Sequence, residues 1–97
     1  MERIQRIFIA LSDPTRLKMV KFLLKGEKCV CDIYPHIRRT QSTTSIQLKK
    51  LEKLNVITSR REGKYTFYRI KDFGVCDIFK ALGHKGEFAC QKKRKSC

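Results

Sequence analysis

Apolar residues recur every three or four positions over residues 2–11, which is the spacing of one helix face. A second stretch with this spacing follows Asp13, a residue type that caps helices, and Pro14, whose fixed φ suits a first helical position. The second stretch is expected to end at Gly26. The pattern therefore predicts two consecutive helices in the first quarter of the chain.

The next stretch, residues 28–37, keeps helical spacing only briefly. Pro35 limits any helix there to a short one, which we expect to start near Cys31. A turn at residues 38–40 then leads into a longer helix over residues 41–54. The first half of this helix is almost entirely small and polar, whereas its second half places leucines on one side.

After the long helix the period changes to that of strands. Residues 56–59 and 65–70 are rich in β-branched and aromatic side chains, and Gly63 between them supplies the positive φ of a hairpin turn. We therefore expect a two-stranded ribbon with a basic tip. Residues 72–82 return to helical spacing and predict a last helix.

Charge makes this outline more specific. The 97 residues carry 23 Lys and Arg against 9 Asp and Glu, a net charge of +14, and their 41% hydrophobic content suffices for one small domain. Residues 38–71 hold ten basic and two acidic side chains, so this third alone contributes +8. We expect a domain over residues 1–84 and a basic, flexible tail over residues 85–97.

A basic surface that crosses several elements favours a polyanionic partner, and double-stranded DNA fits better than a membrane surface. No apolar run is long enough for a transmembrane helix. The first residues also lack the apolar core of a signal peptide, so a cytoplasmic location is expected.

The order of elements predicts a winged helix-turn-helix, a mainly α fold with a β-hairpin. A helix that enters the major groove needs short hydrogen-bonding side chains at its N-terminal end and an apolar rear face. The expected base contacts come from Gln41, Thr43, Ser45 and Gln47. The expected phosphate contacts come from Lys49, Arg60, Arg61 and Lys64. The wider DNA-binding set adds Arg38, Arg39, Thr40 and Ser42.

Four motifs in this order resemble the ArsR/SmtB family of metal- and metalloid-responsive winged-helix repressors. They are the opening signature at residues 11–17, the Cys-Val-Cys-Asp box within residues 28–33, the recognition helix at residues 40–51 and the wing at residues 60–69. The resemblance covers roughly residues 4–71. Ile46 and Gln47 stand where the family commonly has a His-His pair, so the base preference is expected to differ.

The resemblance implies a homodimer built from the first and last helices, with two recognition helices on an inverted-repeat operator. The residues permit this independently, because the terminal helices carry more apolar surface than one small domain is expected to hide. The expected interface residues are Ile4, Ile7, Phe8, Val75, Ile78, Phe79 and Leu82.

The five cysteines favour thiolate chemistry over a disulfide framework, since their number is odd. Cys29 and Cys31 lie about 200° apart in a regular helix, so both sulfurs face one ion only if the helix start is extended or distorted. The resemblance implies a sensor site there for As(III) or a soft divalent ion such as Cd(II), Pb(II) or Zn(II). The sequence leaves Cys76, Cys90 and Cys97 as alternatives for a third sulfur ligand. A disulfide between Cys90 and Cys97 is a further alternative.

Two functions follow. One is a repressor released from its operator by a thiophilic ion; the other is an architectural or constitutive DNA-binding protein whose cysteines are structural. An enzyme is not expected, because no nucleophile–base arrangement or Gly-rich phosphate loop is evident. A carboxylate and His metal site at His84 and Glu87 is disfavoured, because Gly83 and Gly86 interrupt the helix. His36 is expected at the surface near the DNA.

Overall fold

A computed structural model of the chain describes residues 2–83. The expected flexible tail, Cys90, Cys97 and the His84–Glu87 pair lie outside the described residues. The helices are α1 (Arg3–Leu11), α2 (Pro14–Leu23), α3 (Val30–Ile37), α4 (Gln41–Lys53) and α5 (Gly74–Ala81). The strands are β1 (Lys28–Cys29), β2 (Ile57–Glu62) and β3 (Tyr65–Ile70).

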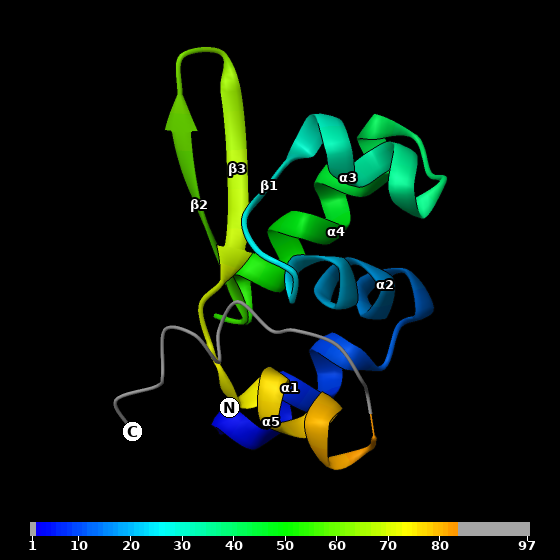
Figure 1. Ribbon diagram of the computed structural model, residues 1–97, viewed down its shortest axis with the longest axis vertical. Helices are drawn as coiled ribbons and strands as arrows, with labels where there is room; N and C mark the ends of the chain where they lie inside the picture. Colours follow the sequence, from blue (N-terminus) through cyan, green and yellow to red (C-terminus); the bar gives the residue numbers. More distant parts are fainter. Residues whose placement is uncertain (1, 84–97) are drawn as a thin grey trace.

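Figure 1 shows the arrangement of a winged helix-turn-helix. The hairpin of β2 and β3 stands beside α3 and α4, and α1 and α5 lie together at the opposite end of the molecule (Figure 1). The predicted mainly α fold with a β-hairpin is therefore confirmed. This arrangement separates the helix with the polar start from the terminal helices.

Local signals set the helix starts as expected at α2 and slightly differently at α3. The Asp13 carboxylate accepts hydrogen bonds from the backbone N–H groups of Thr15 and Arg16 at 2.9 and 3.0 Å, and Pro14 occupies the first turn. The third helix begins at Val30, next to the expected start at Cys31, because Cys29 in extended backbone acts as its N-cap.

The sheet has three strands, so the expected two-stranded ribbon is incomplete. The strand order is β1-β3-β2, and Cys29 of β1 pairs with Phe67 of β3. A strand of two residues leaves no periodic signal in a sequence. The strand β2 extends to Glu62, so the turn is the two-residue loop of Gly63 and Lys64, and Gly63 has the expected positive φ, +61°.

The core lies between the sheet and the inner faces of the helices. Its fully buried side chains include Met19, Val20, Leu23, Leu24, Ile33, Ile37, Leu48, Leu51, Val56, Ile57 and Val75. Three residues expected at the dimer interface belong to this core as well: Ile7, Val75 and Phe79 are 5%, 0% and 9% exposed. The expectation of surplus apolar surface is corrected for these three, because α1 and α5 turn them towards their own chain.

The apolar surface left on the terminal elements is smaller but pronounced. Ile4 and Phe8 of α1 are 63% and 59% exposed, and Leu82, directly after α5, is 84% exposed. Ile78 is partly buried against the core. Of the seven residues expected at the dimer interface, these four remain accessible.

Candidate functional site

The helix α4 has the two faces that a reading helix needs. Its N-cap is Thr40, whose hydroxyl oxygen accepts the backbone N–H of Thr43 at 3.1 Å. Leu48, Leu51 and Thr44 are completely buried on its inner side. The exposed row on its outer side consists of Ser42, Ile46, Lys49, Lys50 and Lys53.

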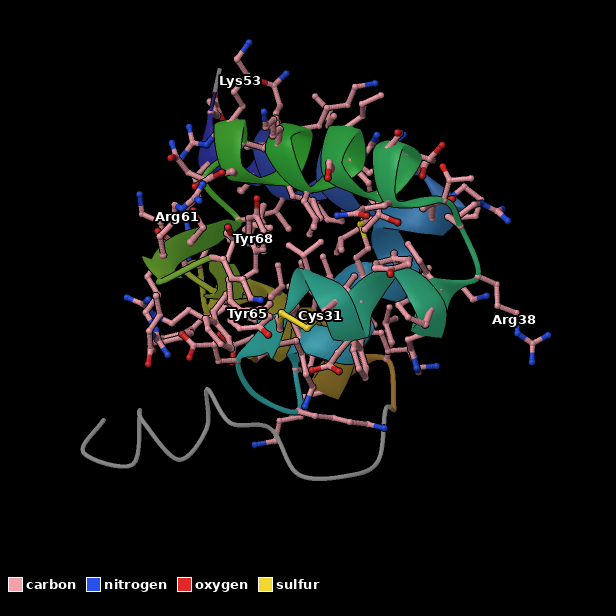
Figure 2. All side chains as sticks on the ribbon, turned by 90° about the horizontal axis from the view of Figure 1, so that it is seen from above. Cys31, Arg38, Lys53, Arg61, Tyr65 and Tyr68 are labelled. Atoms are coloured by element: carbon pink, nitrogen blue, oxygen red, sulfur yellow. A yellow bond between two sulfur atoms is a disulfide. The ribbon has the colours of Figure 1, made fainter. Side chains whose placement is uncertain are left out.

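The turn before α4 presents two arginines to solvent. Arg38 ends α3 in the left-handed conformation, with φ 58° and ψ 45°. Arg38 and Arg39 are both exposed, and Figure 2 shows the side chain of Arg38 extending away from the body of the molecule. The turn therefore adds positive charge next to the N-terminus of α4.

The wing carries exposed cations at its tip, but Arg60 differs from its neighbours. Arg61 and Lys64 are exposed. Arg60 instead forms a bidentate ion pair with Glu27, with nitrogen–oxygen distances of 2.7 and 3.0 Å, and a second pair with Glu62. The hydrogen bonds to Glu27 and then to Glu62 raise the pKa of Arg60. Its charge is thus compensated within the chain, whereas we expected Arg60 to contact a phosphate.

A network that sequence reasoning missed connects Gln47 to two other helices. The Gln47 side-chain oxygen accepts a hydrogen bond from Arg16 of α2 at 3.1 Å. Arg16 also donates to the backbone carbonyls of Ile9 and Ala10 in the last turn of α1, at 3.0 and 3.2 Å. Gln47 is therefore held against α2, whereas we expected it among the base contacts. The sequence does not indicate this contact, because a single charged residue such as Arg16 in the first turn of a helix produces no periodic pattern.

The wing and α4 are joined by a second polar contact. Ser59 of β2 donates its hydroxyl to Glu52 of α4 at 2.7 Å. The neighbouring Tyr68 is buried, and this burial, together with the charge of Glu52, raises the pKa of its phenol. The hydrogen bond between Ser59 and Glu52 therefore fixes the position of the wing relative to α4 on this side.

The structure places the sulfurs of Cys29 and Cys31 together, joined as a disulfide at the start of α3 (Figure 2). The two Cα atoms are 5.1 Å apart, and the extended backbone of Cys29 meets the geometric condition derived from the sequence. Cys29 is 6% exposed, whereas Cys31 is open to solvent. One sulfur thus comes from a buried anchor and the other from the surface.

The two cysteines line one wall of a cavity of about 380 Å³. Its other walls come from α4, through Gln41, Ser45 and Lys49, and from the wing side, through residues 64–66 and Tyr68. Figure 2 shows Tyr65 next to the disulfide, with Tyr68 behind it towards α4. The cysteine pair and the polar start of the recognition helix therefore share one cavity.

Cys76 of α5, one of the three candidates for a third sulfur ligand, lies away from the cysteine pair. Cys76 is 1% exposed in the core and does not line this cavity. Among residues 2–83 no group of three or more His, Cys, Asp or Glu side chains is arranged to hold a metal ion. His36 is exposed, as expected, and stacks on Phe22 with ring centroids 3.9 Å apart.

At the other end of the molecule, an ion pair joins the terminal helices. Arg3 of α1 donates two hydrogen bonds to Asp72, at 2.7 and 2.9 Å, and Asp72 also accepts the backbone N–H of Gly74 at 2.9 Å. The Arg3 hydrogen bond is the largest cause of the lowered pKa of Asp72. None of the helices within residues 2–83 has the length and apolar character needed to span a bilayer.

Known proteins resemble this chain in both sequence and fold. The family model described as bacterial regulatory protein, arsR family, matches residues 13–59. A protein described as an uncharacterized HTH-type transcriptional regulator of Methanocaldococcus jannaschii is 40% identical over 84% of this chain and 92% of its own. A Staphylococcus aureus homolog of the cadmium resistance transcriptional regulatory protein CadC is 39% identical over 89% of this chain and 73% of its own.

Solved structures agree with these relatives. The homodimeric winged helix-turn-helix DNA-binding domain of a possible ArsR-family regulator from Mycobacterium bovis superposes with a TM-score of 0.74 and 29% identity, over 82% of this chain and 74% of that one. NolR from Sinorhizobium fredii gives a TM-score of 0.75 and 28% identity, over 82% and 80% of the two chains. With a polar-faced recognition helix, a basic wing and relatives matched along most of its length, the chain belongs to the ArsR family of transcriptional regulators.

Proposed function

We propose that this regulator is a homodimeric repressor that binds operator DNA through α4 and the wing and is released when a thiophilic ion binds Cys29 and Cys31. The observation that carries the proposal is the shared cavity, whose walls include both sulfurs and three side chains of α4. Relatives support a metal or metalloid inducer: a mercury resistance operon repressor of Streptomyces lividans is 37% identical, and an arsenical resistance operon repressor of Staphylococcus aureus is 31% identical.

The DNA side of the proposal rests on charge and accessibility. The exposed lysines of α4, the two arginines of the preceding turn, and Arg61 and Lys64 of the wing are accessible to phosphates. Figure 2 shows three of these residues, Arg38, Lys53 and Arg61, at the periphery of the molecule. The small side chains of residues 41–45 stand at the helix end that meets base edges. A duplex with two half-sites about one turn apart fits a symmetric pair of such helices.

The ion side rests on where the cysteines sit in the backbone. Cys29 is the N-cap of α3 and also pairs with the wing strand through Phe67. An ion that draws both sulfurs to itself must adjust this backbone, to which α4 is joined by one short turn. Coupling between two such sites is typically 1–3 kcal/mol, or about 5-fold to 150-fold in affinity.

The ion-binding form is the dithiol. A thiol reductant supplies the two electrons and two protons that open the disulfide, and ion uptake then releases the thiol protons. Uptake should therefore strengthen as the pH rises. We propose that a third ligand comes from Cys90 or Cys97, which truncation after Glu87 tests.

The test measures affinity for a duplex selected from a random pool by the reduced full chain. At least one of As(III), Cd(II), Pb(II) and Zn(II) should lower this affinity by about 5-fold to 150-fold. Cys31→Ser should bind DNA as the parent does in the absence of ion and should lose release. Asp32→Asn is the matched control, because Asp32 is the exposed neighbour in the same helical turn and carries no sulfur.

One result would contradict the cysteine site. If the chain with both Cys29→Ser and Cys31→Ser is still released by the same ion at the same concentration, the sulfurs are structural. The constitutive DNA-binding function would then be the better description of this regulator.

A further inference from the structure

One exposed side chain on α4 has a chemistry unlike the rest of its row. Ile46 is 56% exposed, and its neighbours along the row are Ser42, Lys49 and Lys50. The other apolar residues of α4, Leu48 and Leu51, are completely buried. Ile46 belongs neither to the core nor to the partly buried residues packed against it. Nothing in the fold of a single chain therefore uses this side chain.

The side chains next to Ile46 in the sequence make other contacts. Gln47 is held by Arg16, and Ser45 lines the cavity beside the cysteines. Thr44 is buried and Thr43 is partly buried. In the first two turns, the exposed side chains are Gln41, which also lines the cavity, Ser42 and Ile46.

The partner that fits this row carries negative charge around a small apolar group. Lysines flank Ile46 on its C-terminal side, and the surrounding segment of residues 38–71 carries a net charge of +8. In the major groove of DNA, phosphates border base edges that are polar except for the C5-methyl group of thymine. An exposed isoleucine between a serine and lysines is complementary to that pattern.

We propose that Ile46 is a specificity-determining residue that selects thymine in each half-site through contact with its C5-methyl group. This inference rests on the proposed reading of DNA by α4. Burying one methyl group against an apolar side chain contributes about 0.8 kcal/mol, which corresponds to roughly fourfold in affinity for each half-site.

The experiment uses the full chain and duplexes selected by it from a random pool. Each thymine of the selected duplex is replaced in turn by deoxyuridine, which removes the C5-methyl group and keeps the hydrogen-bonding edge. One position per half-site should weaken binding by about fourfold for the parent chain, and the same replacement should leave the affinity of Ile46→Ala unchanged. Ile46→Val, which keeps a branched apolar side chain, should retain a reduced response.

Lys50→Ala is the matched control, because Lys50 lies on the same exposed row without apolar character. It should weaken every duplex alike and keep the full response to deoxyuridine. Equal responses of the parent chain and Ile46→Ala at every position, or a selected half-site without thymine, would overturn the inference while leaving DNA reading by α4 intact. Failure of the parent chain to select any sequence would instead overturn the proposed function, and the inference with it.

Discussion

Arg38 occupies a backbone conformation that favours glycine. Its φ of 58° places it in the left-handed region, which costs a residue with a Cβ atom about 1–2 kcal/mol. Helices commonly end on such a residue, but glycine is the usual choice. Arg38 is exposed, and its guanidinium forms no ion pair within residues 2–83. Strain of this kind concentrates where a side chain serves binding.

We therefore expect Arg38→Gly to raise stability and lower DNA affinity together. The free energy of unfolding should rise by about 1 kcal/mol, as measured by urea denaturation. Affinity should fall for all duplexes alike, and its dependence on salt should become shallower because one phosphate contact is lost. The control is Arg39→Gly, which loses the same charge without a left-handed φ and should not gain stability. A lower unfolding free energy for Arg38→Gly would contradict the interpretation.

Two adjacent arginines on β2 show how the position of a residue decides which partners it contacts. Arg60 and Arg61 are adjacent and chemically identical, yet only Arg60 meets Glu27 and Glu62. Strand alternation sends the two side chains to opposite faces of β2, and one face happens to lie over Glu27. Arg61 is exposed, and we expect it to contact DNA, while Arg60 ties the wing to the loop before β1.

The terminal helices are linked by the pair of Arg3 and Asp72, and this link depends on pH. The Arg3 hydrogen bonds hold the pKa of Asp72 below its ordinary value of 3.8. A carboxylate with a lowered pKa in the folded state stabilises that state above its unfolded pKa, and this contribution disappears as the pH falls through the folded value. The loss therefore begins near pH 3.8 and continues below it.

Asp72→Asn should remove this pH-dependent part while keeping a side-chain oxygen to accept the N–H of Gly74. Arg3 is 63% exposed, so solvent screening keeps the contribution of the pair to stability small. The parent chain should be slightly more stable than the variant near neutral pH, and the difference should decrease at a pH below 3.8. Thermal unfolding at both pH values measures it. A difference that grows on acidification would contradict the assignment.

We expect the outer surface of the terminal helices to form the dimer interface. Ile4, Phe8 and Leu82 expose their side chains, and α1 and α5 lie at the end opposite the wing (Figure 1). Their apolar surface stays in contact with water in the single chain, which favours pairing with an equivalent surface on a second copy. Of the seven residues expected at the interface, we expect these three to contribute most to pairing.

Phe8→Glu or Leu82→Glu should dissociate the dimer and weaken operator binding in the same step. Loss of one of two linked recognition helices lowers affinity for a two-half-site duplex by about 100-fold or more. Sedimentation at micromolar concentration gives the mass, and the same samples give the affinity. Leu17→Glu, a similar change at an exposed leucine of α2, should leave the dimer intact. A parent chain that sediments only as a monomer would contradict the prediction.

Much of the fold could be predicted because its signals are local. Asp13 and Pro14 start α2 through contacts with the next three residues, and Gly63 permits the hairpin turn through its own φ. Leu48 and Leu51 recur at the helical period and are buried as that period requires. Even the condition on Cys29 and Cys31 followed from helix geometry alone.

The sequence by itself thus determined the order of the helices and the hairpin, the polar start of α4, the basic wing and the placement of the cysteine pair before the turn. Only the tertiary structure decided which partners these residues meet. Arg16 and Gln47 are 31 positions apart, Arg60 and Glu27 are 33 apart, and the pairing of β1 with β3 joins Cys29 to Phe67. Such contacts depend on how distant segments pack, and a charged or polar residue carries the same local pattern whether its partner is another side chain, water or DNA.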